Sequence, residues 1–149
     1  MNDLLIYLVD DDDDDRLLLR EAFRHHPAPC ILREFDDGRQ VIDHLGVIIT
    51  DEFPNLMLLD LNMPRMNGFD TLKAIREHRE WKTIPVAILT TSDDPRDRQR
   101  SKELGADAYM VKPPNYALLK EIINRGVAIA KADAANDDAC CIITKPKHI

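Results

Sequence analysis

The feature that most constrains this chain is a series of five short apolar segments separated by longer polar or amphipathic stretches. Each apolar segment is too short for an ordinary helix and is flanked by turn residues or charges, which is typical of buried β-strands. The predicted strands are residues 4–9, 30–35, 55–60, 84–90 and 107–111.

The stretches between these strands predict helices. They cover residues 14–26, 38–46, 69–80, 96–104 and 115–131. In the first helix, Leu17, Leu18, Ala22 and Phe23 are expected on the core-facing side. Residues 47–54 stay ambiguous between a strand and a helix end followed by a loop.

Alternating strands and helices predict an α/β domain with a parallel sheet covered on both faces, which right-handed crossovers make doubly wound. The 149 residues suit one domain, placed at 1–131, with a loosely ordered C-terminal tail at 132–149. In such sheets, ligands bind beyond the carboxyl ends of the strands.

Charge and hydropathy narrow the function classes. The net charge is −7, from 27 acidic and 20 basic residues, which argues against direct binding to nucleic acid or an anionic membrane. No apolar run is long enough to span a bilayer, and the start MNDLLIYLVD lacks the basic region of a signal peptide, so we expect a cytoplasmic protein. The cysteines Cys30, Cys140 and Cys141 are expected to be reduced thiols without a functional role.

Polar residues follow four of the predicted strands at the point where each strand ends. They are Asp10 and Asp11, Asp60, Thr90 and Lys112. Because the carboxyl ends of parallel strands meet at one edge of the sheet, these five side chains are expected to converge.

Three carboxylates at one edge repel each other, since two unit charges 4 Å apart cost about 4 kcal/mol at an effective dielectric of 20. Lys112 supplies one positive charge, and Mg²⁺, which selects all-oxygen ligands, would supply two more. A carboxylate in such a site can attack phosphorus and form an acyl phosphate, while Thr90 and Lys112 bind phosphoryl oxygens.

The strings YLVDDD, LMLLDLNMPRMNG, VAILTTSDD and GADAYMVKPP resemble the receiver-domain family of two-component signalling, in the family's order over about residues 3–130. The resemblance implies a (βα)5 flavodoxin-like fold with strand order 2-1-3-4-5. It also implies a switch that takes a phosphoryl group from a sensor histidine kinase and loses it slowly, without being an enzyme in the ordinary sense. LTTSDDPRD and the Lys-Pro-Pro string are similar to small stand-alone receivers that partner phytochrome-type kinases.

Position by position, the resemblance assigns the phosphoacceptor to Asp60. It assigns metal binding to Asp11 directly, to Asp10 through water, and to the backbone carbonyl of Asn62.

The remaining matched positions are those of the switch. Thr90 matches the switch hydroxyl, Lys112 the family's lysine, and Tyr109 the aromatic residue that swings inward. The chain departs from the common pattern at Thr91, where a smaller residue is usual, and at Pro114, where many receivers carry an aromatic residue.

The resemblance also implies partners. The output would pass to a downstream protein or a phosphotransfer protein, and the elements at 96–104, 107–111 and 115–131 are a candidate homodimer surface.

Two other functions stay open. One is a receiver-like interaction module without phosphotransfer. The other is an aspartate-nucleophile phosphatase of the haloacid-dehalogenase kind, which Asn62 disfavours because that chemistry wants a second aspartate there. Within the run Asp10–Asp15, the last four residues are expected to cap the following helix or to face solvent, and one of them could also tune metal affinity.

Overall fold

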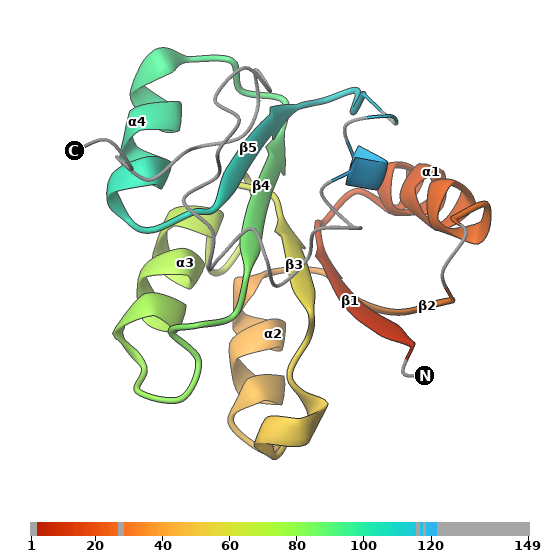
Figure 1. The fold of residues 1–149 in the computed structure, drawn as a ribbon. Coiled ribbons are helices and arrows are strands. Elements are labelled where there is room, and N and C mark those ends of the chain that lie inside the picture. Colours follow the sequence, from red (N-terminus) through yellow and green to blue (C-terminus); the bar gives the residue numbers. More distant parts are fainter. Residues whose placement is uncertain (1–2, 27–28, 116, 118, 122–149) are drawn as a thin grey trace.

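The computed structural model describes residues 3–26, 29–115, 117 and 119–121. The strands are β1 (Leu4–Val9), β2 (Cys30–Phe35), β3 (Leu56–Leu59), β4 (Val86–Thr90) and β5 (Ala108–Val111). The helices are α1 (Asp13–Arg24), α2 (Gly38–Leu45), the 3₁₀ turn η1 (Thr50–Glu52), α3 (Gly68–Glu77) and α4 (Pro95–Glu103). All strand pairs are parallel and the order is β2-β1-β3-β4-β5, which confirms the predicted flavodoxin-like sheet (Figure 1).

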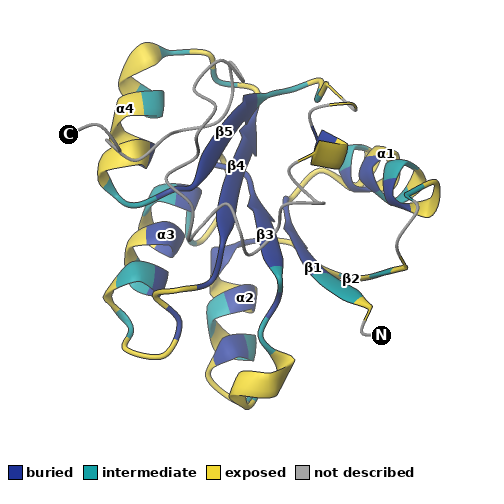
Figure 2. Cartoon of the chain, viewed as in Figure 1, coloured by how far each residue is buried: buried dark blue, intermediate teal, exposed yellow. Residues whose placement is uncertain are grey.

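The sheet separates two hydrophobic cores because successive side chains of a strand point to opposite faces. In β1, Tyr7 and Val9 pack into the core that includes side chains of α2 and α3. Ile6 and Leu8 of the same strand pack into the core that includes α1. The strands at the centre of the sheet are therefore buried on both faces, whereas the helices keep an exposed outer face (Figure 2).

The structure corrects the predicted core side of the first helix and resolves the segment before β3 that the sequence left ambiguous. Leu19 and Phe23 form the buried side of α1, whereas Leu17 and Leu18 are 47% and 52% exposed. Three consecutive leucines span too wide an arc of a helix for all of them to face one core. The ambiguous residues 47–54 contain no strand, and η1 occupies their centre.

The helix ends follow from side-chain capping. Asp12 accepts hydrogen bonds from the backbone N–H groups of Asp14 and Asp15, which confirms that part of the aspartate run caps α1. Gly105 follows the C-cap of α4 with φ +102°, a left-handed conformation that glycine adopts without strain and that commonly ends a helix.

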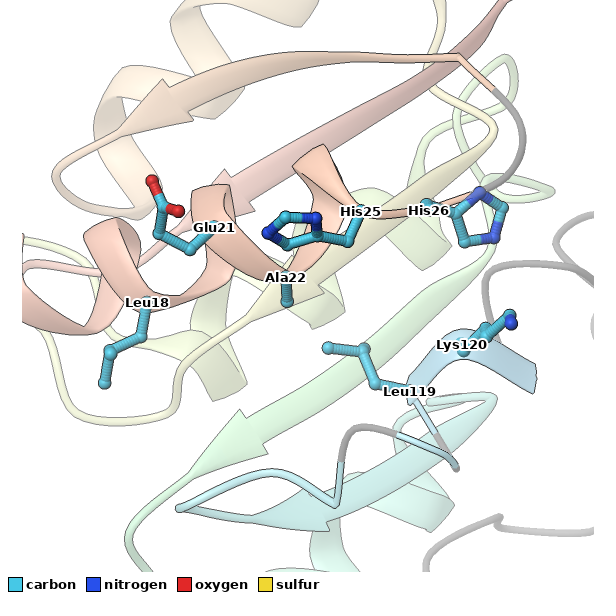
Figure 3. A pocket seen from close by; sticks show the side chains of 7 residues that line it. All are labelled: Leu18, Glu21, Ala22, His25, His26, Leu119 and Lys120. Carbon is cyan, nitrogen blue, oxygen red and sulfur yellow. The ribbon is translucent and has the colours of Figure 1, made fainter.

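The predicted last helix lies mostly outside the described residues. Ala117 and Leu119–Glu121 are helical, and Asn115 is described outside a helix. Residues 116, 118 and 122–131, the predicted tail at 132–149, Cys140 and Cys141 are not described. Leu119 lies beside α1, where Leu18, Ala22 and His25 line a cavity of about 380 Å³ with it (Figure 3). None of the helices in the described part of the chain has the length and apolar character needed to cross a membrane.

Gly68 is where α3 comes closest to the end of β3. Its backbone N–H donates to the carbonyl of Leu61 at 2.9 Å. A Cβ atom at this position would lie 2.2 Å from the Asp60 carbonyl oxygen and 2.7 Å from the Leu61 Cα atom. Both neighbours are backbone atoms, so the sequence Asn67-Gly68 sets how closely α3 packs beneath Asp60.

We therefore expect Gly68→Ala to lower the free energy of unfolding by about 1–3 kcal/mol, the usual cost of forcing an extra methyl group into a packed site. Urea unfolding followed by Trp81 fluorescence measures this change. Gly46→Ala is the matched control, because its Cβ would meet Asp43 and Ile42 carbonyl oxygens at 3.5 and 3.6 Å, which is ordinary contact. Equal stability of the two variants would show that α3 can move away without cost.

Candidate functional site

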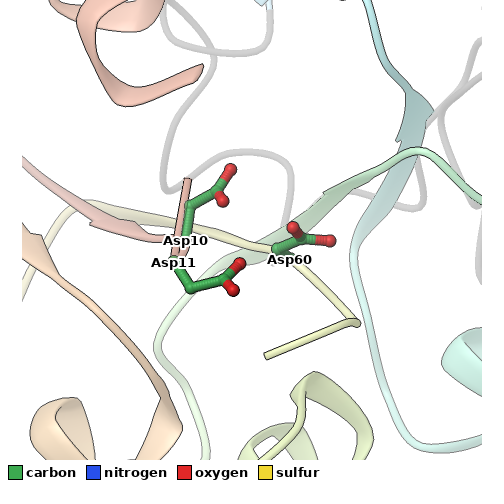
Figure 4. A group of neighbouring side chains, drawn as sticks. All are labelled: Asp10, Asp11 and Asp60. Carbon is green, nitrogen blue, oxygen red and sulfur yellow. The ribbon is translucent and has the colours of Figure 1, made fainter. Parts of the chain in front are cut away.

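Three aspartates meet at the carboxyl ends of β1 and β3 (Figure 4). One carboxylate oxygen from each of Asp10, Asp11 and Asp60 lies within 4.8 Å of the other two. The Asp60 backbone N–H donates to the Val9 carbonyl at 2.9 Å, so the register of the two strands fixes this convergence. Asp10 and Asp60 are buried and Asp11 is exposed, which leaves the cluster one side open to solvent.

Lys112 reaches the same cluster from the end of β5. Its backbone N–H donates to the Thr90 carbonyl at 2.7 Å, which ties it to the end of β4. Its Nζ atom donates to Asp10 Oδ2 at 2.7 Å and to Asp60 Oδ2 at 3.1 Å. The predicted lysine and all three predicted carboxylates therefore lie together in one site.

Burial and neighbouring charges shift the pKa values of Asp10 and Lys112. Burial, with a smaller contribution from the Asp60 charge, raises the pKa of Asp10 to about 6 even though Lys112 and the Asp12 N–H group act in the opposite direction. For Lys112, burial alone would lower the pKa, but its hydrogen bonds to Asp10 and Asp15 and the charges of Asp60 and Asp10 together outweigh burial and raise it. The site therefore favours the charged form of Lys112, whereas it disfavours the charged form of Asp10.

Thr90 and Tyr109 lie on the adjacent strands β4 and β5 and are both fully buried. The Tyr109 hydroxyl donates to the Ser92 carbonyl at 2.8 Å, and the Arg98 guanidinium stacks 4.6 Å from the centre of its ring. The Ser92 N–H in turn donates to Thr90 Oγ1 at 3.4 Å. Ser92 therefore links the two predicted switch residues.

The loop after Asp60 is fixed at several points. Asp60 Oδ1 accepts from the N–H of Leu61 at 2.7 Å and more weakly from that of Asn62 at 3.4 Å. Further along, Arg65 has a positive φ of 61° and forms an ion pair with the buried Asp37 at the start of α2. These contacts hold the loop near the acceptor, and the metal contact of the Asn62 carbonyl stays a prediction.

Two residues of this region escaped the sequence analysis. Asp15 was expected to cap α1 or to face solvent. Instead, its Oδ2 atom accepts a hydrogen bond from Lys112 Nζ at 2.7 Å. Arg16 is buried and donates to the Asp10 carbonyl, and it pairs with Glu34 at 2.9 Å. The sequence did contain a signal for Arg16. It is an arginine on the buried side of an amphipathic helix, next to a strand that ends in acidic residues.

The donor set suits a hard divalent cation. The three clustered carboxylates supply only oxygen ligands, and one protein cation, Lys112, offsets one of their three charges. Mg²⁺ and Mn²⁺ accept such ligands, keep part of their water shell and would use the exposed side at Asp11.

The two departures noted in the sequence lie together. Thr91 and Pro114 line a cavity of about 280 Å³ beside Lys112, whose other walls include Leu18 and Leu89. The departures therefore shape the approach to the site and leave its charged residues in place.

We expect Asp10→Asn to stabilise the metal-free protein at pH 7, because asparagine resembles the protonated carboxyl that the folded state favours. A rise in the folded-state pKa from 3.8 to about 6 corresponds to on the order of 3 kcal/mol. The sign follows from linkage: the cost of ionised Asp10 is absent near pH 4 and complete above pH 6, so the advantage of the variant grows between these values. Urea unfolding at a series of pH values, in EDTA, measures it.

Asp12→Asn is the control for this variant, because it removes a charge from the same run and leaves a residue that caps α1 equally well. The stability advantage of Asp10→Asn over Asp12→Asn is therefore expected to grow between pH 4 and pH 6. A stability advantage of Asp10→Asn that is constant from pH 4 to 7 would contradict the raised pKa of Asp10.

Comparison with known proteins agrees with this geometry. The family model of the response regulator receiver domain matches residues 6–124. The transcriptional regulatory protein CpxR of Escherichia coli (strain K12) is 41% identical over 131 residues, which cover 88% of this chain and 50% of CpxR. The chain thus spans half the length of that relative.

Solved structures give the same result. The Mn²⁺-bound form of the response regulator Rcp1 is 32% identical, with a TM-score of 0.69 over 80% of this chain and 88% of Rcp1. The phosphorylated cyanobacterial phytochrome response regulator RcpA is 28% identical, with a TM-score of 0.72 over 90% of this chain and 98% of RcpA. Together with the sheet order and the acidic edge, these matches show that the chain belongs to the response regulator receiver domain family of two-component signalling.

Proposed function

We propose that this receiver domain accepts a phosphoryl group on Asp60 from a sensor histidine kinase and signals to a protein partner through the change that follows. The observation that carries the proposal is the position of Asp60. Its carboxylate lies within 4.8 Å of Asp10 and Asp11, and its Oδ2 atom lies 3.1 Å from Lys112 Nζ. A nucleophile, a cation site and a fixed positive charge thus share one site.

In the proposed transfer, a carboxylate oxygen of Asp60 attacks the phosphorus atom of a phosphohistidine. The new O–P bond forms as the P–N bond breaks, and the electron pair passes to the imidazole nitrogen. Lys112 offsets the negative charge brought in by the phosphoryl oxygens. Asp10, Asp11, Asp60 and the Asn62 carbonyl would hold Mg²⁺, which supplies charge neutralisation when it is bound.

Thr90 and Tyr109 are the proposed switch. The Thr90 hydroxyl would turn toward the new phosphoryl oxygens, and this motion would disturb its contact with the Ser92 N–H group. Because Ser92 also accepts from the Tyr109 hydroxyl, the aromatic residue would register the change.

The proposed assignment extends to domains and partners. The family match supports a receiver domain at 1–131, followed by the segment 132–149. Similarity to a phytochrome response regulator supports a phytochrome-type kinase as the phosphodonor. The surface of α4, β5 and the segment 115–131 is the proposed site for a downstream protein, a phosphotransfer protein or a second copy of the chain.

Incubation with acetyl phosphate and Mg²⁺, followed by intact mass, tests the acceptor. We expect one phosphoryl group on the wild-type chain and none on Asp60→Asn. Asp43→Asn, which removes an exposed aspartate from α2, should behave as the wild type. EDTA should abolish the mass increase, because the three clustered carboxylates would then lack the cation that lets a phosphate group approach.

This assay and one with small phosphomonoesters separate the two alternatives. An unchanged mass in the wild type would indicate an interaction module without phosphotransfer. Sustained turnover of small phosphomonoesters, with release of free phosphate, would indicate a phosphatase.

Thr90→Ala tests the switch. We expect Asp60 still to take a phosphoryl group, because Thr90 is not the nucleophile, but we expect the phosphorylation-dependent change in the NMR signals of the Tyr109 ring to be lost. Thr90→Ser keeps the hydroxyl and should retain the change. A full response of Tyr109 in the alanine variant would contradict the role of this hydroxyl.

A further inference from the structure

The contact between Asp15 and Lys112 is explained by none of the roles assigned so far. A lysine ammonium group has three N–H donors. In this structure, they meet three carboxylates, at 2.7 Å from Asp10 Oδ2, 2.7 Å from Asp15 Oδ2 and 3.1 Å from Asp60 Oδ2. The two shorter bonds hold the ammonium group, and the longer bond points to the acceptor.

The two short bonds differ in what else they do. Asp10 also belongs to the carboxylate cluster and accepts from the Asp12 N–H group. A cation bound there would draw on the negative charge of Asp10 and weaken its hold on the lysine. Asp15 stands on the first turn of α1, outside the carboxylate cluster, so its bond to Lys112 does not compete with a cation.

The surroundings of the Asp15–Lys112 pair favour a strong interaction. The Lys112 side chain is 9% exposed and that of Asp15 is 30% exposed. Both residues line the cavity beside Leu18 and Leu89, so one side of the pair faces apolar groups. Charges interact more strongly where water is partly excluded, and an ordinary surface ion pair would contribute much less.

We propose that Asp15 is a positioning residue that holds the Lys112 ammonium group on the α1 side of the site, with its third donor directed at Asp60. The inference rests on the proposed phosphoacceptor function for its kinetic consequence, but not for the contact itself. When a phosphoryl group is attached to Asp60, one of its oxygens would take over the donor that now points to Oδ2, while Asp15 keeps the lysine in place.

The turn of α1 that carries Asp15 is itself bound to the sheet. Arg16, the next residue, is bound to the Asp10 carbonyl and to Glu34 of β2. The first turn of α1 is therefore fixed to the sheet beside Asp10. Through Asp15, this fixed turn restrains a lysine that lies 97 residues further along the chain.

The experiment compares Asp15→Asn with Asp14→Asn and Asp15→Glu. Asp14 lies in the same turn of α1 and is exposed, so its variant matches the loss of charge and the change at the helix N-terminus. Asp15→Glu keeps the charge on a side chain one methylene longer, which the flexible lysine can follow.

The first measurement is trace labelling of the metal-free proteins with acetic anhydride, read at Lys112 by peptide mass spectrometry. Loss of the Asp15 carboxylate removes one of the three groups that hold the Lys112 amine, so the amine becomes more accessible. We therefore expect its acylation rate to rise about three- to tenfold in Asp15→Asn. The Asp14→Asn rate should equal that of the wild type, and Asp15→Glu should return most of the way to it.

The second measurement is the phosphorylation rate with acetyl phosphate and saturating Mg²⁺. We expect the maximal rate of Asp15→Asn to fall about three- to tenfold, because misplacement of a charge-stabilising group slows transfer. Rescue in Asp15→Glu, together with a normal Asp14→Asn rate, supports positioning, since neither result follows from a general loss of stability.

The outcomes separate this inference from the phosphoacceptor proposal. If Lys112 is labelled at the same rate in Asp15→Asn and Asp14→Asn, the positioning of Lys112 by Asp15 is overturned, whatever the protein does with acetyl phosphate. If labelling changes as expected but the wild type takes up no phosphoryl group, the positioning of Lys112 by Asp15 is supported and the proposed function fails. If labelling changes and the phosphorylation rate of Asp15→Asn equals that of the wild type, the kinetic role of Asp15 is overturned.

Discussion

The structure depends on one constraint: carboxylates are held together at the edge of a sheet where they cannot move apart. Asp10 and Asp60 follow neighbouring strands, and the hydrogen bond from the Asp60 N–H to the Val9 carbonyl fixes their separation. The raised pKa of Asp10 reflects this confinement, because burial and the Asp60 charge together disfavour its ionised form. Lys112 compensates part of the charge, and the remainder makes the site receptive to a divalent cation.

A fold can sustain such a site only if its stability comes from elsewhere. Here it comes from the two cores on either side of the sheet, to which the strand residues contribute in alternation. The carboxylates lie beyond the ends of these strands, so their repulsion does not weaken the packing of Tyr7, Leu8 or their neighbours. The close approach of Gly68 to the Asp60 backbone then brings α3 beneath the acceptor without a side chain between them.

The sequence predicted what depends on local pattern and chain order. Five apolar runs marked the strands, and the polar residues at the ends of four of them marked the edge where Asp10, Asp60 and Lys112 meet. It failed where only tertiary position decides. Nothing local tells which of three consecutive leucines in α1 faces the core, and nothing local distinguishes Asp15, which contacts a lysine 97 residues away, from the exposed Asp14 beside it.

The geometry also suggests how a charge at the buried edge could reach the surface. Ser92 bonds to three elements at once: its N–H donates to Thr90 Oγ1 in β4, its carbonyl accepts from Tyr109 in β5, and its hydroxyl donates to Asp97 in α4 at 2.6 Å. The bond to Thr90 is the longest of these at 3.4 Å, with the threonine oxygen as acceptor. In the proposed switch, a turn of this hydroxyl to donate to a phosphoryl oxygen would weaken that bond first. A small local motion there would alter the constraints on Ser92, and α4 and β5 would respond together because both are bound to it.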